Sequence, residues 1–442
     1  MQLAGAKVLV VGMKKSGVAA AELLLSHGAD VRTTDIKPLA DLPEAQALLA
    51  RAGLPFAIQT KGVFENVDII VLSPDVPADL EPLREARRRG VLVIGEVELA
   101  APYLLGETIG ITGSNGKTTT TSLTGHILRE AGVPVQVGGN IGKAVCAMVE
   151  TSRAGTWNVL ELSSFQLETI FQFRARVGVA LNVTQNHLDR HHTFESYVAA
   201  KRRLFETQDR NDLAVLNAAD PVCVGYSKAA RGTVEWFNAE PGAVLRDGKV
   251  WLQGAELMNA GEIPIRGRHN VDNVMAASLA AARAGVAPPA IRSAVHSFQA
   301  VEHRLEFVRS RGGVDFYNDS KATSVDATLK AVEAFPGGLW IILGGKDKGL
   351  DYTQLREPLR QKARAALLIG AAAEKIGHVL EGAVPLIHAG TLDCAISDAA
   401  AKAQPGDTIL LAPACASFDQ FKSFEHRGEV FKQLVRALPE KE

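Results

Sequence analysis

The segment 108–120, TIGITGSNGKTTT, constrains the fold of this chain more than any other stretch. A short apolar run leads into a glycine-rich turn, and the turn leads into a Lys-Thr-Thr sequence that should open a helix. Glycines allow several backbone N–H groups to point at one phosphate, and a helix N-terminus adds partial positive charge. The order strand, turn, helix is typical of α/β folds with parallel sheets.

The same turn predicts a nucleoside triphosphate site. Lys117 would add a full positive charge, and the hydroxyl of Thr118 would be a ligand for Mg²⁺. Ile111 stands where the common phosphate-loop motif has its first glycine, so the loop is a shortened form. The alternative is a structural strand-to-helix turn that happens to carry Gly and Lys.

Composition excludes several classes of protein. The chain has 442 residues, 47% hydrophobic and 22% charged, which describes a globular protein of roughly three domains. A net charge of −1 gives no basic excess for nucleic acid, and no apolar run reaches the roughly 20 residues of a membrane span. The four cysteines are far apart, as expected of free thiols in a reducing compartment. We expect a cytoplasmic protein with no nucleic-acid or membrane partner.

Three segments each begin afresh with a strand, a turn and a helix. We therefore predict an α/β protein of three domains, each built on a mainly parallel sheet: a Rossmann-like N-terminal domain (1–95), a central phosphate-loop domain (96–302) and a Rossmann-like C-terminal domain (303–442). Residues 233–265 are strand-rich and polar, and they predict a small antiparallel addition to the central domain.

A glycine turn, GMKKSG at 12–17, follows the first predicted strand, and Asp35 ends the second. The spacing is similar to a dinucleotide fingerprint, but Lys14 replaces the middle glycine and would obstruct an NAD pyrophosphate. A purely structural turn is the other alternative. We favour a nucleotide-sugar site, with Lys14 or Lys15 facing a diphosphate and Asp35 facing a uracil or ribose.

Polar residues follow two apolar strands of the central segment. Glu161 ends one strand, and His187 comes shortly after the next. Ligands bind at the carboxyl ends of parallel strands, so Glu161 could hold the Mg²⁺ that Thr118 binds, and His187 could be a further ligand. Lys201 by itself is an ordinary helix lysine.

The third segment repeats this arrangement. The loops 318–323 (NDSKAT), 344–349 (GGKDKG) and 413–421 (PACASFDQF) each follow a predicted strand, and His303 and Arg304 lie at its start. Each loop alone could be solvated, but together they favour a binding face.

With these motifs assembled, the whole chain resembles the Mur ligase family, most specifically in residues 113–120, 161–168, 318–323 and 413–428. The resemblance implies an ATP-dependent ligase of peptidoglycan precursor synthesis. Its last two segments imply that D-glutamate is added to UDP-N-acetylmuramoyl-L-alanine. The resemblance as a whole implies an acyl-phosphate intermediate and a monomer. A sibling ligase, a folylpolyglutamate synthase, a nucleotide-binding regulatory protein and an NAD-dependent dehydrogenase are the alternatives.

The resemblance also implies residue roles for ATP and metal. ATP would be bound by Gly113, Ser114, Asn115, Gly116, Lys117, Thr118, Thr119, Asn270, Asn273, Arg304 and Asp319. Two Mg²⁺ ions are implied, one on Thr118 and Glu161 and one on His187 and Lys201, with Lys201 carrying a CO₂-derived carbamate. The catalytic set would be Lys117, Glu161, His187, Lys201 and Lys321.

Further residues would bind the other two substrates. The UDP substrate would contact Lys15, Ser16, Asp35, Ser73, Asn140 and His187, and D-glutamate would contact Thr323, Lys348, Ser417 and Phe424. The chain departs from the family in its first domain, where Lys14 and Asp75 each replace a usual glycine and Lys15 replaces a neutral residue. An acid at 75 near a diphosphate is unfavourable unless paired, so we predict that Lys14 or Lys15 pairs with Asp75.

Overall fold

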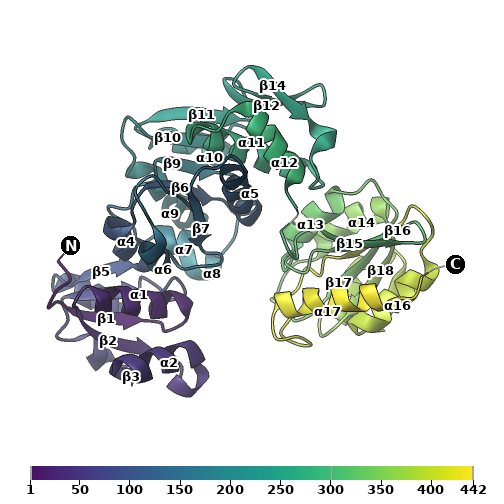
Figure 1. Cartoon of the computed structure of the whole chain (residues 1–442). Coiled ribbons are helices and arrows are strands. Elements are labelled where there is room, and N and C mark those ends of the chain that lie inside the picture. Colours follow the sequence, from purple (N-terminus) through teal and green to yellow (C-terminus); the bar gives the residue numbers. More distant parts are fainter. Residues whose placement is uncertain (1, 300, 441–442) are drawn as a thin grey trace. The chain divides into compact units, whose positions relative to one another are not determined.

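The computed structural model describes residues 2–299 and 301–440 (Figure 1). The chain forms two compact units, one of Met1–Ala260 with Asp272–Val295 and the other of Gly261–Val271 with His296–Glu442. Three sheets, each mainly parallel, confirm the predicted α/β fold class. The boundaries 1–95, 96–302 and 303–442 stay a prediction. Among the helices of the described ranges, none combines the length and the apolar character that crossing a membrane requires.

The first sheet is entirely parallel, in the order β3-β2-β1-β4-β5. Its strands are β1 (Lys7–Val11), β2 (Asp30–Asp35), β3 (Phe56–Ile58), β4 (Ile69–Leu72) and β5 (Leu92–Gly95), and its helices are α1 (Lys15–Ser26), α2 (Pro43–Ala52) and α3 (Glu81–Arg88). The strand order reverses between β1 and β4. The loops after these two strands, 12–14 and 73–76, therefore lie together at the carboxyl edge, where such sheets bind ligands.

The second sheet has the order β14-β13-β12-β11-β10-β9-β6-β8-β7. Its strands are β6 (Glu107–Thr112), β7 (Val135–Gly139), β8 (Trp157–Glu161), β9 (Val177–Ala180), β10 (Leu213–Asn217), β11 (Thr233–Phe237), β12 (Gly242–Arg246), β13 (Lys249–Leu252) and β14 (Ala255–Asn259). Its helices are α5 (Lys117–Glu130), α6 (Val145–Met148), α7 (Ser164–Leu167), α8 (Leu188–His191), α9 (Phe194–Glu206), α10 (Pro221–Tyr226), α11 (Arg268–Arg283) and α12 (Pro288–Ser297).

The strands β12, β13 and β14 form the predicted antiparallel addition. The prediction was wrong for β11, which pairs in parallel with β10. The polar, strand-rich sequence of 233–265 suggested a single antiparallel addition, but the chain returns from β10 through α10, so β11 runs parallel to β10.

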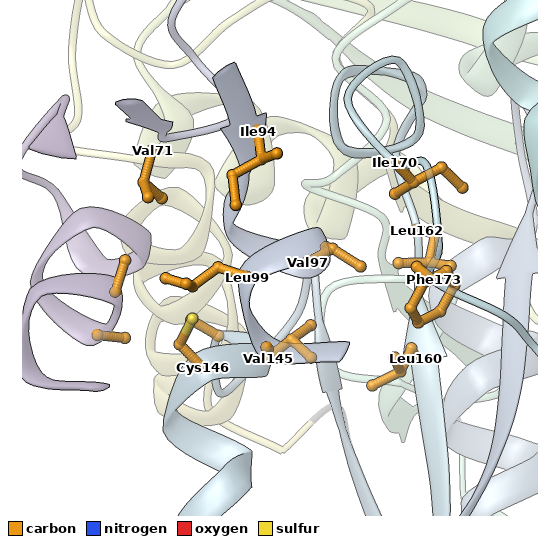
Figure 2. Packing of buried hydrophobic residues seen from close by; sticks show 14 of the residues in the cluster. Val71, Ile94, Val97, Leu99, Val145, Cys146, Leu160, Leu162, Ile170 and Phe173 are labelled. Atoms are coloured by element: carbon orange, nitrogen blue, oxygen red, sulfur yellow. The ribbon is translucent and has the colours of Figure 1, made fainter. Parts of the chain in front are cut away.

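One hydrophobic core joins the first two sheets through α4 (Glu96–Ala100), which follows β5 directly. In Figure 2, Val97 and Leu99 of α4 have Val71 and Ile94 of the first sheet on one side. On the other side are Leu162 and Phe173, which lie between β8 and β9 of the second sheet. The carboxylate of Glu98 strengthens this joint, because it accepts the backbone N–H groups of residues 171–173 at 2.8–3.0 Å. This shared core places the first two sheets in one compact unit.

The third sheet has the order β15-β16-β20-β17-β18-β19, and only β15 is antiparallel to its neighbour. Its strands are β15 (Glu306–Arg311), β16 (Val314–Asn318), β17 (Leu339–Gly344), β18 (Ala363–Ile369), β19 (Leu386–Gly390) and β20 (Thr408–Leu411), and its helices are α13 (Val325–Glu333), α14 (Arg356–Lys362), α15 (Ala373–Leu380), α16 (Leu392–Lys402) and α17 (Phe424–Ala437). Because β16, β20 and β17 are neighbours, the three predicted binding loops leave the same edge of the sheet.

Candidate active site

The phosphate loop connects β6 to α5 and is fixed by the loop that follows β9. The backbone N–H of Ser114 donates to the carbonyl of Asn182 at 2.8 Å, and the N–H of Asn115 donates to the side-chain oxygen of Asn182 at 2.9 Å. Gly116 has a φ of +84°, and a Cβ there would lie 2.5 Å from Oδ1 of Asn273. The turn therefore requires glycine for its conformation and for the close approach of α11.

The side chain of Lys117 folds over this loop. Its Nζ donates to the carbonyls of Gly113 and Ser114 at 2.8 and 2.9 Å. The ammonium group thus lies beside the loop that was predicted to bind phosphates. Thr119 is buried in the first turn of α5.

Three predicted residues meet at the start of α5. The hydroxyl of Thr118 donates to one carboxylate oxygen of Glu161 at 2.7 Å, and the amide of Asn140 donates to the other at 3.0 Å. Thr118 and Glu161 are buried, whereas Asn140 is exposed. A hydroxyl and a carboxylate are hard oxygen donors of the kind that Mg²⁺ takes together with water, so this pair fits the predicted ion.

Lys201 lies on α9 beneath the phosphate loop and is 1% exposed. Its Nζ donates to the carbonyl of Gly113 at 2.9 Å and to the hydroxyl of Thr112 at 3.3 Å. Burial, together with the nearby charge of Lys117, holds the pKa of Lys201 well below that of an ordinary lysine. The structure therefore provides a buried lysine that readily loses its proton.

Tyr197 is a site residue that the sequence did not reveal. Its hydroxyl bonds to that of Ser114 at 2.9 Å, and the Nζ of Lys201 lies 4.7 Å from the centre of its ring. The ring of His187 lies 6.3 Å from the same ring and 4.9 Å from that of Phe165. The only sequence signal was that Tyr197 precedes Lys201 by one helical turn. His187 itself is exposed and has a φ of +54°.

Four of the predicted nucleotide-sugar residues lie at the carboxyl edge of the first sheet: Lys15, Ser16, Asp35 and Ser73. The hydroxyl of Ser73 donates to the carbonyl of Gly12 at 2.9 Å, while Lys15 and Ser16 form the first turn of α1. Asp35 is buried and accepts the backbone N–H groups of Met13 and Lys37 at 2.6 and 2.9 Å. Asp35 thus stabilises the β1 loop, and its contact with a base or ribose stays a prediction.

The predicted partner of Asp75 is confirmed as Lys14. The Nζ of Lys14 lies 2.7 Å from the carboxylate of Asp75, and both side chains are largely exposed. The ion pair joins the loop after β1 to the loop after β4. It links two of the three positions at which the first domain departs from the pattern of the family that the sequence resembles.

Loss of this pair should weaken binding of the nucleotide sugar slightly. For the nucleotide sugar that is predicted to bind here, we expect Lys14→Ala to raise the KM about threefold at low salt, because an exposed pair contributes at most about 1 kcal/mol and the freed Asp75 would repel the diphosphate. Lys14→Ala/Asp75→Ala should return the KM close to the wild-type value. An unchanged affinity in Lys14→Ala/Lys15→Ala would contradict a role for either lysine.

The second unit brings together Arg304, Asp319 and Lys321. Burial raises the pKa of Asp319 to about 7, against the opposing charges of Arg304 and Lys321. Within the described ranges, the Nε of Arg304 is buried without a hydrogen-bond partner, and the Nζ of Lys321 lies 5.5 Å from the ring centre of Phe424. Asn270, also in this unit, donates to the carbonyl of Arg266 at 2.6 Å.

The residues predicted to bind D-glutamate lie in segments that follow strands at the carboxyl edge of the third sheet. The Nζ of Lys348 lies 3.3 and 3.4 Å from the carbonyl and the hydroxyl of Thr323. Ser417 is buried in the loop after β20, and Phe424 begins α17. The structure brings Thr323 and Lys348 into contact, and it places Lys321 against Phe424.

Arg427 holds two of these loops and was also missed from sequence. Its guanidinium is fully buried and donates to the carbonyls of Ser320, Cys415 and Ala416 and to the hydroxyl of Ser320, at 2.8–3.4 Å. It therefore fixes the 318–323 loop against the 413–421 loop. Segment 413–428 had been singled out, but a helical arginine gives no sign that it is buried.

Comparison with known proteins places these features in one family. Three family models match the chain: "Mur ligase MurD-like, N-terminal domain" at residues 6–95, "Mur ligase middle domain" at 111–281 and "Mur ligase, glutamate ligase domain" at 303–415. A protein of Solibacter usitatus named UDP-N-acetylmuramoylalanine--D-glutamate ligase is 70% identical, with all of both chains covered. A protein of the same name from Koribacter versatilis is 48% identical over all of both chains.

Solved structures share the fold at low identity. The MurF ligase of Thermotoga maritima in complex with ADP aligns with a TM-score of 0.62 at 17% identity, covering 98% of this chain and 96% of that one. The UDP-N-acetylmuramate-alanine ligase MurC of Thermotoga maritima aligns with a TM-score of 0.61 at 18% identity, covering 98% and 99%.

Proposed function

The chain belongs to the Mur ligase family, and from this membership we propose that it joins D-glutamate to UDP-N-acetylmuramoyl-L-alanine and converts ATP to ADP and phosphate. This proposal rests mainly on the 70% sequence identity, over the full length of both chains, to a ligase named for this reaction. The product would be a peptidoglycan precursor. We further propose that the protein acts as a monomer in the cytoplasm, where ATP and nucleotide sugars are supplied.

The reaction would proceed in two steps. The alanyl carboxylate attacks the γ-phosphorus of ATP, and the bond to the β-phosphate oxygen breaks to give an acyl phosphate and ADP. The D-glutamate amine then attacks the acyl carbon and loses a proton, and phosphate leaves as the amide forms. In phosphoryl transfer a protein mainly positions the reactants and stabilises charge.

The phosphate loop supports the first step. The backbone of residues 113–119, the start of α5 and the ammonium of Lys117 together provide a positive cradle for the ATP phosphates. Asn273 packs against Gly116 and bonds to Thr120 at 3.2 Å, which supports its predicted place at the nucleotide. Asn270, Arg304, Asp319 and Lys321 remain our proposals for contacts with ATP and the transferred phosphoryl group.

The oxygen donors of Thr118 and Glu161 fit a Mg²⁺ ion, which when bound would neutralise charge on the phosphates. We propose a second ion on His187 and on Lys201 in its carbamate form. The buried and readily deprotonated amine of Lys201 supports this modification, because only a neutral amine reacts with CO₂.

For the incoming amino acid we propose Thr323, Lys348, Ser417 and Phe424. D-glutamate carries two carboxylates, and Lys348 supplies a cation within reach of the Thr323 hydroxyl. For the UDP substrate, the proposed contact residues remain Asn140, Ser73, Lys15, Ser16, Asp35 and His187.

Phosphate release provides the test of this function. Purified protein is incubated with ATP, Mg²⁺ and UDP-N-acetylmuramoyl-L-alanine, together with D-glutamate, L-glutamate, L-alanine, L-lysine or meso-diaminopimelate. We expect release only with D-glutamate, with an amide product of matching mass. Release with another amino acid would keep the ligase chemistry and assign a sibling activity, and no release with any of them would contradict the proposal.

A further inference from the structure

Arg190, in the last turn of α8, joins two loops that come from different sheets. Its Nη2 donates to the carbonyl of Val76 at 2.7 Å and its Nη1 to that of Asp75 at 3.2 Å, with the carbonyl of Pro74 at 3.5 Å. The same guanidinium bonds to the carboxylate of Glu168 at 2.5 Å. The side chain of Arg190 is only 10% exposed and that of Glu168 is 18% exposed. This is a largely desolvated ion pair with additional acceptors, unlike the exposed pairs elsewhere on the surface.

The carbonyl acceptors of Arg190 belong to the 73–76 loop, which other contacts also hold against the loop after β1. Ser73 donates to Gly12, Lys14 pairs with Asp75, and a Cβ at Gly12 would lie 2.8 Å from atoms of Ser73 and Val76. The 73–76 loop is therefore contacted from two sides. The loop after β1 contacts it within the first sheet, and Arg190 contacts it from a helix that belongs to the second sheet.

The other side of Arg190 faces the residues around His187. The guanidinium carbon lies 4.8 Å from the ring centre of Phe165, and the rings of His187 and His191 lie 4.9 and 5.5 Å from the same ring. Nε2 of His191 also lies 2.9 Å from the hydroxyl of Ser164. The side chains of His187, Arg190 and His191 thus pack around Phe165. Arg190 links this segment to the loop after β4 by hydrogen bonds, and the next residue but one, His192, adds a contact to Asp79 at 3.0 Å. A narrow cleft lined by Ser73, Pro74, Val76, Phe165 and Glu168 lies beside this link.

We propose that Arg190 is a positioning residue for the nucleotide-sugar substrate, because it sets the distance between the 73–76 loop and the segment that carries His187. This inference rests on the proposed function, in which Ser73 and His187 contact that one substrate. Arg190 itself touches backbone carbonyls and Glu168, so its effect is on where these two contacts lie. A planar group with several donors is needed to hold carbonyls and a carboxylate together, and lysine cannot reproduce it.

Steady-state kinetics of Arg190→Met and Arg190→Lys test the inference. We expect the KM for UDP-N-acetylmuramoyl-L-alanine to rise about thirtyfold in Arg190→Met and about fivefold in Arg190→Lys, which keeps the charge. The KM values for ATP and D-glutamate should stay within about twofold. Arg202→Met is the matched control, because Arg202 makes a half-exposed pair with Glu206 on the next helix and should leave all three KM values unchanged.

Two further measurements keep the test decisive. If Arg190→Met fails to fold, Glu168→Gln removes the counter-charge while preserving shape, and an intermediate rise in the same KM is expected. The dissociation constant of the UDP substrate, measured by calorimetry, does not depend on turnover. Wild-type protein that binds this substrate but releases no phosphate would contradict the proposed reaction, whereas equal dissociation constants in wild type and Arg190→Lys would overturn the role of Arg190. A parallel rise of all three KM values would also overturn it, because it would indicate general loosening.

Discussion

Replacement of Lys201 by alanine should lower kcat about a thousandfold and leave the affinity for ATP within a few-fold of wild type. The reason is that the proposed carbamate would be a ligand for a metal ion, and metal sites typically contribute several kcal/mol to charge stabilisation during transfer of a phosphoryl group. The phosphate loop, with Lys117 and the start of α5, is left in place by this substitution.

The lowered pKa of Lys201 predicts how activity that needs the carbamate should depend on pH. Burial and Lys117 lower that pKa, so the amine is neutral over a wider range of pH than an exposed lysine would be. A lysine is protonated below its pKa, and the protonated form does not react with CO₂. Activity that depends on the carbamate should therefore decline as the pH falls through the lowered pKa. It should also decline when bicarbonate is removed, and it should return when bicarbonate is added.

Two variants separate the carbamate from mere packing. Lys201→Ala leaves a cavity beside the phosphate loop, which costs about 2–3 kcal/mol of stability, but a small carboxylate such as formate can enter it and restore part of the activity. Lys201→Met fills the same space without a charge and should be equally inactive and not rescued. Wild-type rates in Lys201→Ala without added carboxylate would refute the carbamate role.

Features of sequence that are local predicted the fold and part of the site. The apolar strands, the glycine turns and the helices behind them specified three mainly parallel sheets, because these signals lie within a few residues of one another. The carboxyl-edge rule then placed Glu161 beside Thr118, and this contact is present at 2.7 Å. An electrostatic argument that started from the family resemblance predicted that Lys14 or Lys15 pairs with Asp75, and the partner is Lys14.

Residues whose partners lie far away in the sequence could not be predicted in this way. Arg190 and Arg427 bind carbonyl groups, which every residue has, so no sequence pattern distinguishes them from solvated arginines. Tyr197 becomes a site residue only because α9 packs under the phosphate loop. The hydrogen bonds that Asp35 accepts from two backbone N–H groups at its own sheet edge were also not predicted, while its contact with a ligand stays a prediction. In each case the partner is set by the packing of elements, which local sequence does not encode.

Removal of the Thr118 hydroxyl should produce the second large loss of activity. Thr118→Val has nearly the same shape, so we expect it to fold, with kcat lowered about a hundredfold and half-maximal activity at about tenfold higher Mg²⁺. Thr118→Ser keeps the hydroxyl and should remain within about threefold of wild type. The comparison isolates one oxygen atom, because valine differs from threonine by a methyl in place of that hydroxyl.

Glu161→Gln completes this test from the other side of the pair. Glutamine has nearly the same shape, but it removes the negative charge and replaces one of the two oxygens that accept from Thr118 and Asn140 with an NH₂ group, so kcat should again fall at least about a hundredfold with a raised Mg²⁺ requirement. Thr118→Val and Glu161→Gln together should lose little more than either alone, because residues that hold one ion act as a unit. Glu206→Gln, on the exposed face of α9, serves as the charge-matched control. The proposal would be contradicted if the losses of kcat in the two single variants added fully in the double variant, or if Thr118→Val and Thr118→Ser were equally active. Either result would show that the oxygens of Thr118 and Glu161 do not bind a common Mg²⁺.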